Sequence, residues 1–202
     1  MALRNELPTA ANSHNFNTVS NAATKPGTTL DNLKAAVTGE TGATTKYAAY
    51  AKAAKAAGYD QIARLFEATS AAEQIHIDLE KRLVQKVEPD YQGPTATAPA
   101  AEETDLNLIG SANGEIFETS DMYPSFIKVA QQEGDTAAEA VFTRAKLAES
   151  YHAQRYLDAY NTIDCPSDEH YYLCPFCGYI HKGTEFDKCP ICGAPKDKFR
   201  EF

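Results

Sequence analysis

Residues 73–76 read Glu-Gln-Ile-His, and residues 149–152 read Glu-Ser-Tyr-His. Each tetrapeptide follows a Gly-Glu pair at a distance, Gly39-Glu40 for the first and Gly114-Glu115 for the second. The tetrapeptides lie 76 residues apart (149 − 73) and the Gly-Glu pairs 75 apart (114 − 39), so the two copies differ by one inserted residue. Self-similarity on this scale indicates an architecture built from two related units.

The segments that carry these residues are expected to be helical, because apolar side chains recur at helical spacing and alanine is abundant. Thr28 or Thr29 can cap the first helix. Gly58 and Gly134 are suited to end the first and third helices. Pro124 should kink the third helix unless local geometry absorbs the missing N–H donor. The expected helices span residues 29–57, 60–87, 104–133 and 135–162.

Two antiparallel hairpins of these helices would bring four glutamates to nearly the same height, near mid-helix. The low-complexity connection at 89–103 is longer than a tight turn needs, which indicates a full-length crossover of the ferritin-like kind. The predicted fold is an all-α four-helix bundle, ferritin-like with a long crossover, followed by a small four-cysteine knuckle. The expected divisions are a flexible tail or loosely docked arm at 1–28, a bundle at 29–165 and a knuckle domain at 166–202.

A glutamate and a histidine three residues later share one helix face. A single such pair is more often a solvated face than a ligand pair, but two copies at matching repeat positions argue against that reading. Burying several carboxylates together without cations would be prohibitive, and mixed carboxylate and imidazole ligation suits iron or manganese. The residues expected to face one interior are Glu40, Glu73, His76, Glu115, Glu118, Glu149 and His152.

Three further residues near this set leave alternatives open. Glu118 has no counterpart in the first copy, where Ala43 stands, so one metal position could gain an extra carboxylate. Tyr47 and Tyr123 follow Glu40 and Glu115 by 7 and 8 positions. Core packing with a carboxylate-bonded hydroxyl is the plainer interpretation, and a local proton or electron donor is the sharper one.

The C-terminal segment contains two knuckle motifs, Cys174-Pro-Phe-Cys177-Gly and Cys189-Pro-Ile-Cys192-Gly, separated by 11 residues. A unit of about 30 residues cannot build an adequate core, so a metal is expected to hold it together. Four thiolates favour tetrahedral zinc or a single iron. Cys165 lies outside both motifs and is expected to be unligated.

Composition narrows the classes of partner and location. The net charge of −9 argues against nucleic acid or an anionic membrane as a partner. No apolar run approaches the roughly 20 residues that span a bilayer, and residues 1–27 lack the apolar core of a signal peptide. Four of the five cysteines stand at metal-site spacing, which suits a reducing cytosol better than a disulfide framework does.

A glutamate-rich four-helix repeat followed by such a knuckle resembles the rubrerythrin family over about residues 29–202. The resemblance implies that the seven glutamates and histidines are di-iron ligands, with Glu73 and Glu149 bridging the irons and Glu40 and Glu115 terminal. It also implies that one iron moves between the Glu118 carboxylate and His76 when the redox state changes. Tyr47 and Tyr123 look like the family's tyrosines beside the metals.

The same resemblance implies a peroxidase for oxidative-stress defence, in which hydrogen peroxide, two electrons and two protons give two waters. The expected cofactors are two irons in the bundle and one iron on the cysteines, with zinc as an alternative at either site. Electrons would come from rubredoxin or an NAD(P)H-dependent reductase in the cytoplasm. The alternatives are a ferroxidase that handles iron, which would lack the knuckle, and a zinc-ribbon protein that acts as an oxygen sensor or binding module.

Geometry adds one expectation about assembly. A knuckle tethered after the fourth helix is expected at a bundle end, roughly 20 Å along the axis from the metals at the waist. Electron transfer within one subunit would be slow over that distance. The sequence therefore predicts a head-to-tail homodimer in which one chain's knuckle faces the other chain's metals.

Overall fold

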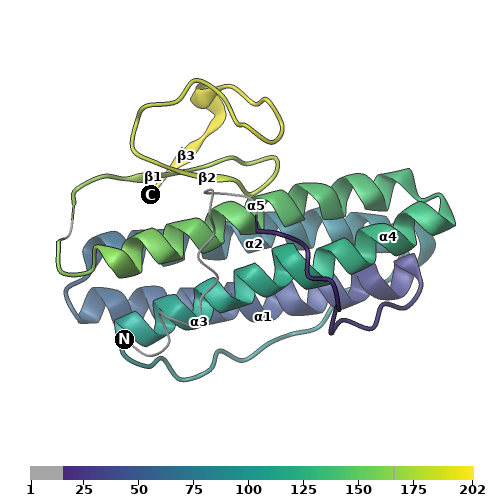
Figure 1. Ribbon diagram of the computed structural model, residues 1–202, viewed down its shortest axis with the longest axis horizontal. Coiled ribbons are helices and arrows are strands. Elements are labelled where there is room, and N and C mark those ends of the chain that lie inside the picture. Colours follow the sequence, from purple (N-terminus) through teal and green to yellow (C-terminus); the bar gives the residue numbers. More distant parts are fainter. Residues whose placement is uncertain (1–15, 166) are drawn as a thin grey trace.

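The computed structural model describes residues 16–165 and 167–202, and it confirms the predicted all-α bundle with a small C-terminal knuckle (Figure 1). The first two helices match their predicted bounds within a residue. The predicted third helix is divided into two α-helices by a π-helical turn. The elements of the bundle are α1 (Thr29–Ala56), α2 (Asp60–Val87), α3 (Thr104–Phe117), the π-turn η2 (Glu118–Met122), α4 (Tyr123–Glu133) and α5 (Thr136–Asn161).

The bundle consists of two antiparallel hairpins joined by a crossover. One hairpin is α1 with α2, and the other is α3, η2 and α4 with α5. Residues 88–103 run lengthwise beside the bundle from the end of α2 to the start of α3 (Figure 1). This is the predicted ferritin-like crossover, because a connection at one end alone would not return the chain to the start of a parallel-running helix.

Asn32 and Asn107, which lie 75 residues apart in the two copies of the repeat, have the same local role. The Asn32 side chain accepts from the Gly27 N–H at 2.9 Å and donates to the Gly27 carbonyl at 3.3 Å. Asn107 makes the equivalent pair of bonds with Glu102, at 3.1 and 2.8 Å. Each asparagine thus ties the incoming chain to the first turn of its helix, where backbone N–H groups lack helical partners.

The helix ends follow the predicted capping chemistry. Thr28 and Asp31 form a capping box at the start of α1. Gly58, two residues after α1, and Gly134, directly after α4, have φ angles of +85° and +73°. That left-handed conformation favours glycine, and it lets each hairpin turn within a few residues.

The third helix shows how the extra residue of the second copy is accommodated. The repeat offset changes from 75 to 76 between Glu115 and Tyr123, and η2 occupies this interval. A π-turn holds one residue more than the α-helical turn it replaces. Pro124 follows immediately in the first turn of α4, where its missing N–H is tolerated. The insertion and the proline therefore explain one local distortion together.

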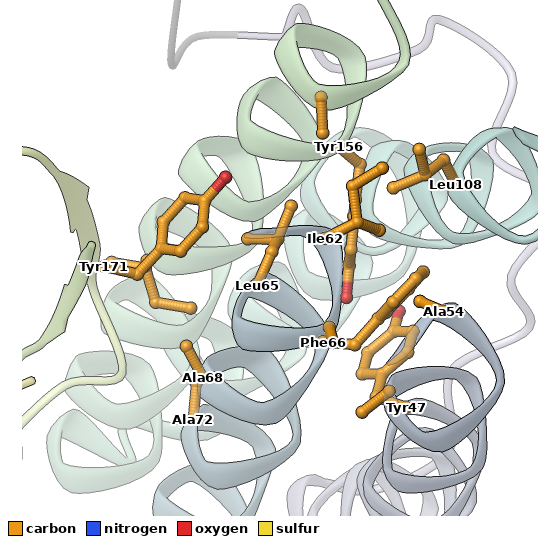
Figure 2. Packing of buried hydrophobic residues seen from close by; sticks show 14 of the residues in the cluster. Tyr47, Ala54, Ile62, Leu65, Phe66, Ala68, Ala72, Leu108, Tyr156 and Tyr171 are labelled. Carbon is orange, nitrogen blue, oxygen red and sulfur yellow. The ribbon is translucent and has the colours of Figure 1, made fainter. Parts of the chain in front are cut away.

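The core lies between the four helices and continues under the knuckle. Figure 2 shows Tyr47, Phe66 and Tyr156 packed together, with ring centroids 5.2–6.0 Å apart. Leu108 from α3 and Tyr171 from the knuckle belong to the same cluster. A second cluster around Phe126 and Phe142 fills the other end of the bundle. The metal-ligand residue types lie between these two apolar clusters.

The knuckle contains a three-stranded antiparallel sheet of order β2-β1-β3, formed by β1 (Tyr171–Leu173), β2 (Ile180–Lys182) and β3 (Arg200–Glu201). It lies along the side of the bundle over α2 and α5, not beyond the bundle end (Figure 1). The expected separation of roughly 20 Å from the waist is therefore wrong. Of the nine linker residues between α5 and β1, the described ones (162–165 and 167–170) fold back along the helices, and the Gln61 side chain donates to Ser167 and to the Glu169 carbonyl.

Two expectations concern the chain outside the bundle. Of the N-terminal segment 1–28, residues 1–15 lie outside the described residues, and residues 16–28 lie against the bundle. Phe16 is buried, as expected of a docked arm and not of a flexible tail.

Among the described residues, the longest helices are too polar to cross a membrane.

Candidate metal centre

The waist of the bundle holds two overlapping groups of buried ligand residues. One group is Glu40, Glu73, His76 and Glu149, and the other is Glu73, Glu115, Glu149 and His152. Within each group the ligand atoms all lie within 4.8 Å of one another. Glu73 and Glu149 belong to both groups. Two shared and two unshared carboxylates, with one imidazole per group, form the donor set of a dinuclear carboxylate site.

Each histidine turns one ring nitrogen toward this centre. His76 Nδ1 lies 3.0 Å from Glu73 and 2.9 Å from Glu149. His152 Nδ1 lies 2.7 Å from Glu149. The outer nitrogens point away: His76 Nε2 lies 3.1 Å from the Cys177 carbonyl, and His152 Nε2 lies 2.7 Å from the Gly178 carbonyl. A carbonyl only accepts, so Nε2 carries the proton in both rings and Nδ1 is left for a metal.

The hydrogen-bond inventory of the centre fits bound cations. A buried oxygen of Glu40 has no hydrogen-bond partner, and the buried oxygens of Glu73, Glu115 and Glu149 at this point face only the Nδ1 atoms of the two histidines, at 2.7–3.6 Å. Two ring nitrogens cannot satisfy this many oxygens, and crowded buried carboxylates are costly without further positive charge. Metal ions at the centre of the two groups would satisfy these atoms at once.

Electrostatics in the metal-free site lead to the same conclusion. Burial and the neighbouring Glu73 carboxylate raise the pKa of Glu115 to about 8. Burial would also raise the pKa of Glu149, but His76 and His152 lower it to about 2. Burial would lower the pKa values of both histidines, yet Glu149 raises them well above normal. Without metal the site holds protons, so metal binding must release them.

Glu118 lies at the edge of the site. It stands in η2, it is half-buried, and it belongs to neither ligand group. Burial and the carboxylates of Glu115 and Glu149 raise the pKa of Glu118 well above normal. The structure thus brings six of the seven expected ligands together. It places Glu118 close enough to them for their carboxylates to raise its pKa.

The two tyrosines connect the halves of the bundle. Tyr47 of α1 donates its hydroxyl to Glu115 of α3, and Tyr123 of α4 donates to Glu40 of α1. Burial and these carboxylates raise the pKa values of both phenols well above normal, so both remain protonated donors. Each phenol therefore bonds to an unshared carboxylate of the opposite repeat, not to the one that precedes it in its own helix.

Glu80 is a buried carboxylate that sequence reasoning missed. It is completely buried, and one of its oxygens lies 2.9 Å from the Tyr123 hydroxyl. Burial raises the pKa of Glu80 to about 8. The available signal was its position on the face of Glu73 and His76, at i+7 and i+4. The repeat offset of 76 matches it with Tyr156, so the two halves differ at this place.

The four cysteines of the knuckle converge as predicted. Cys174 and Cys192 sulfurs are 3.5 Å apart, as are those of Cys177 and Cys189. Hydrogen bonds from Cys174 and Cys177 lower the pKa of the Cys189 thiol to about 2. Four sulfurs at this separation suit one tetrahedral ion. Cys165 is exposed and belongs to no ligand group among the described residues.

Gly178 joins the two metal sites. Its φ of +77° forms the turn after Cys177, and a Cβ there would lie 2.4 Å from His76 Nε2. Only glycine allows this approach of the knuckle backbone to the imidazole. Because the Cys177 and Gly178 carbonyls accept from the two histidines, the four-sulfur site and the carboxylate site are in contact within one chain. One chain therefore needs no partner to bring the two sites together, and the distance between them gives no reason to expect a dimer.

Comparison with known proteins agrees with this geometry. Residues 31–160 match the family model described as rubrerythrin, and residues 172–200 match the model of the rubrerythrin rubredoxin-like domain. Nigerythrin of Nitratidesulfovibrio vulgaris is 62% identical over 202 residues, which is 100% of both chains. Rubrerythrin-2 of Clostridium acetobutylicum is 33% identical over 88% of this chain and 98% of its own.

Solved structures give the same relation. Nigerythrin in the fully reduced, all-ferrous state superposes with a TM-score of 0.91 at 63% identity, over 97% of each chain. Symerythrin from Cyanophora paradoxa shares the fold, with a TM-score of 0.61 at 18% identity over 74% of this chain and 92% of its own. With a carboxylate and histidine centre of the di-iron type and a rubredoxin-like four-cysteine site in one chain, this protein belongs to the rubrerythrin family.

Proposed function

We propose that this chain is a di-iron peroxidase that reduces hydrogen peroxide to water with electrons relayed through its four-cysteine iron site. The observation that carries the proposal is the contact between the two sites. Both imidazoles of the carboxylate centre donate to backbone carbonyls of the knuckle, at Cys177 and Gly178. A ferroxidase that stores iron has no use for a one-electron site at this place.

We assign the ligands as follows. Glu73 and Glu149 would bridge the two ions, because each belongs to both ligand groups. Glu40 with His76 would complete one ion, and Glu115 with His152 the other. Glu118 would be an additional, adjustable carboxylate, because it stands beside Glu115 without joining either group. Cys174, Cys177, Cys189 and Cys192 would hold the third ion.

Bound there, a ferrous pair supplies two electrons and Lewis acidity to peroxide. The protein residues supply position and protons. Burial of the waist excludes bulk water, and the outer N–H bonds hold both imidazoles in one orientation. Tyr47 and Tyr123 hold the unshared carboxylates by donating hydrogen bonds to them. As neutral phenols, they also keep protons close to the place where peroxide would react. Two protons and two electrons per peroxide complete the balance to two waters.

The electron donor in this proposal is a rubredoxin or an NAD(P)H-dependent reductase of the cytosol. The head-to-tail homodimer also remains a prediction, although the distance between the two metal sites within one chain does not require it. The knuckle is joined by a nine-residue linker, so two chains could exchange knuckles and keep every contact described above. Sedimentation at several protein concentrations would test for the dimer.

The test of function is anaerobic mixing of the reduced, iron-loaded protein with hydrogen peroxide. We expect one peroxide to be consumed for every two electrons, with oxidation of the four-cysteine iron visible in its thiolate band. A protein that ignores peroxide, yet turns ferrous iron and oxygen into a mineral core, would support the ferroxidase alternative. Absence of a thiolate–iron band in a protein with full metal content would indicate a zinc knuckle.

A further inference from the structure

The N-terminal arm, defined here as residues 16–24, lies on the π-turn that carries Glu118. The Val19 N–H donates to the Ser120 carbonyl at 3.0 Å. The Ala23 and Thr24 N–H groups donate to the two carboxylate oxygens of Asp121, at 2.7 and 3.0 Å. Three backbone bonds thus join the arm to two consecutive residues of η2, about 100 positions later in the chain.

The Ser120 carbonyl, which accepts from the Val19 N–H, cannot form the ordinary α-helical hydrogen bond to the residue four positions later. Pro124 stands four residues after Ser120 and has no N–H, so the α-helical bond to the Ser120 carbonyl cannot form. Ser120 and Asp121 are both 6% exposed. A buried carbonyl and a buried carboxylate at a helix distortion need donors, and the arm provides them.

The arm is also fixed at its beginning. Phe16 is 5% exposed and packs with Ile109, Ile116 and Ala153. Ile116 lies one residue after Glu115, so this apolar contact flanks the same part of the helix. Opposite the arm, the Thr119 hydroxyl donates to the Lys146 carbonyl of α5 at 2.7 Å. The π-turn is therefore held on one side by α5 and on the other by the arm.

We propose that the arm is a positioning element for Glu118: by binding Ser120 and Asp121, it holds the π-turn in the register that directs the Glu118 carboxylate toward the metal centre. This deepens the role proposed for Glu118 above and rests on it. The first repeat has neither the inserted residue nor a carboxylate at the matching position, Ala43, so only the second repeat needs the arm.

The cleanest test leaves the bundle unchanged. Val19→Pro removes the N–H that serves Ser120, while Val19→Ala truncates the same half-exposed side chain and keeps that N–H. In the metal-free full chain, we expect amide exchange in the segment 116–123 to accelerate about fivefold or more in Val19→Pro, as for loss of one hydrogen bond. Val19→Ala should match the wild type. Equal exchange in both variants would overturn the proposal.

A second pair of variants addresses the carboxylate. Asp121→Asn replaces one carboxylate oxygen by an amide NH₂ group, which cannot accept from the Ala23 or Thr24 N–H that it faces. Glu133→Gln is the control, because Glu133 accepts the Thr29 N–H at 3.0 Å away from the π-turn. Faster exchange of 116–123 should follow only from Asp121→Asn. Equal effects of the two substitutions would contradict the proposal.

The link to Glu118 is tested by a double-mutant cycle on the iron-loaded protein. We expect Val19→Pro and Glu118→Gln each to change the reduction potential or electron paramagnetic resonance spectrum of the carboxylate site, while the thiolate band stays constant. Combined, they should do no more than Glu118→Gln alone. Fully additive changes would show that the arm does not act through Glu118. None of these readouts needs peroxide turnover, so failure of the peroxidase assay would leave this test intact.

Discussion

The two halves of the bundle offer nearly the same ligands but surround them differently. The α1–α2 hairpin is regular, and it contains the buried Glu80, whose carboxylate contacts the Tyr123 hydroxyl of the other half. The second half contains the π-turn with Glu118, and Tyr156 where the first half has Glu80. The shared features are those a dinuclear centre requires. The differences lie one layer outward, where they can make two otherwise equivalent metal positions unequal.

The largest effect is expected where the halves are equivalent. Glu73→Gln and Glu149→Gln each remove a carboxylate common to both ligand groups. Either should abolish binding of both ions in the bundle and reduce peroxide turnover at least about 100-fold, more than loss of an outer partner costs. Metal analysis should find only the knuckle ion. Glu139→Gln, at a half-buried position in the first turn of α5 that belongs to neither ligand group, is the control. Retention of one bundle ion would disprove sharing.

A smaller effect is expected where the halves meet the knuckle. In Gly178→Ala, the three atoms nearest the added Cβ all belong to the His76 ring, so the clash falls on the imidazole of the first half. Gly193→Ala occupies the same place in the other knuckle motif, with φ +76° and nothing within 4 Å. Both should lose roughly 1 kcal/mol to backbone strain.

Only Gly178→Ala should slow oxidation of the four-cysteine iron after peroxide, by about tenfold or more, because the clash falls on an outer partner of a metal ligand. Stopped-flow absorbance of the thiolate band measures this rate. Equal rates in the two glycine variants would mean that electrons do not pass through this contact.

The smallest effect concerns the place where the halves differ, in the metal-free protein. The pKa of Glu80 is about 8 when folded, above its ordinary value of 4.5. Its contribution to stability is therefore full below pH 4.5 and is lost as the pH rises toward 8. Glu80→Gln removes this loss, so its stability advantage over wild type should grow between pH 5 and 8, with roughly 2–4 °C in Tm for each 1 kcal/mol gained.

Tyr156→Phe is the matched control for that measurement. Burial raises the pKa of Tyr156 well above normal, so the phenol is neutral in this range whether the chain is folded or not. Its stability difference from wild type should be independent of pH between 5 and 8. Thermal denaturation of the two variants at pH 5, 6.5 and 8 decides the matter, and parallel curves would show that Glu80 is already ionised in the folded protein.

Much of this site was predictable because the ligand pattern occurs twice in the sequence. Glu73 with His76 and Glu149 with His152 were identified from matching spacing, and the structure brings them together. Glu80 has no such second copy, so in the sequence only its place on the helix face of Glu73 and His76 distinguishes it from a solvated glutamate. The offset change from 75 to 76 indicated an insertion, but only the backbone shows that a π-turn absorbs it.

The position of the knuckle could not be predicted for a different reason. Helix periodicity and cysteine spacing are local properties, whereas the path of the linker after Asn161 depends on contacts with Gln61 and with the two histidines. Those contacts use main-chain carbonyls of Cys177 and Gly178, which no side-chain pattern records. The error in the expected distance arose from this step.

Synthesis on the ribosome runs from the N-terminus, so the four bundle helices are made before the knuckle. The carbonyls that orient His76 and His152 come from residues 177 and 178, which follow the bundle in the sequence. A nascent bundle can therefore fold with both imidazoles unrestrained, and its carboxylate centre reaches its final form only after these two residues have been added. Folding of the knuckle onto the bundle is thus also the step at which the two redox sites are first connected.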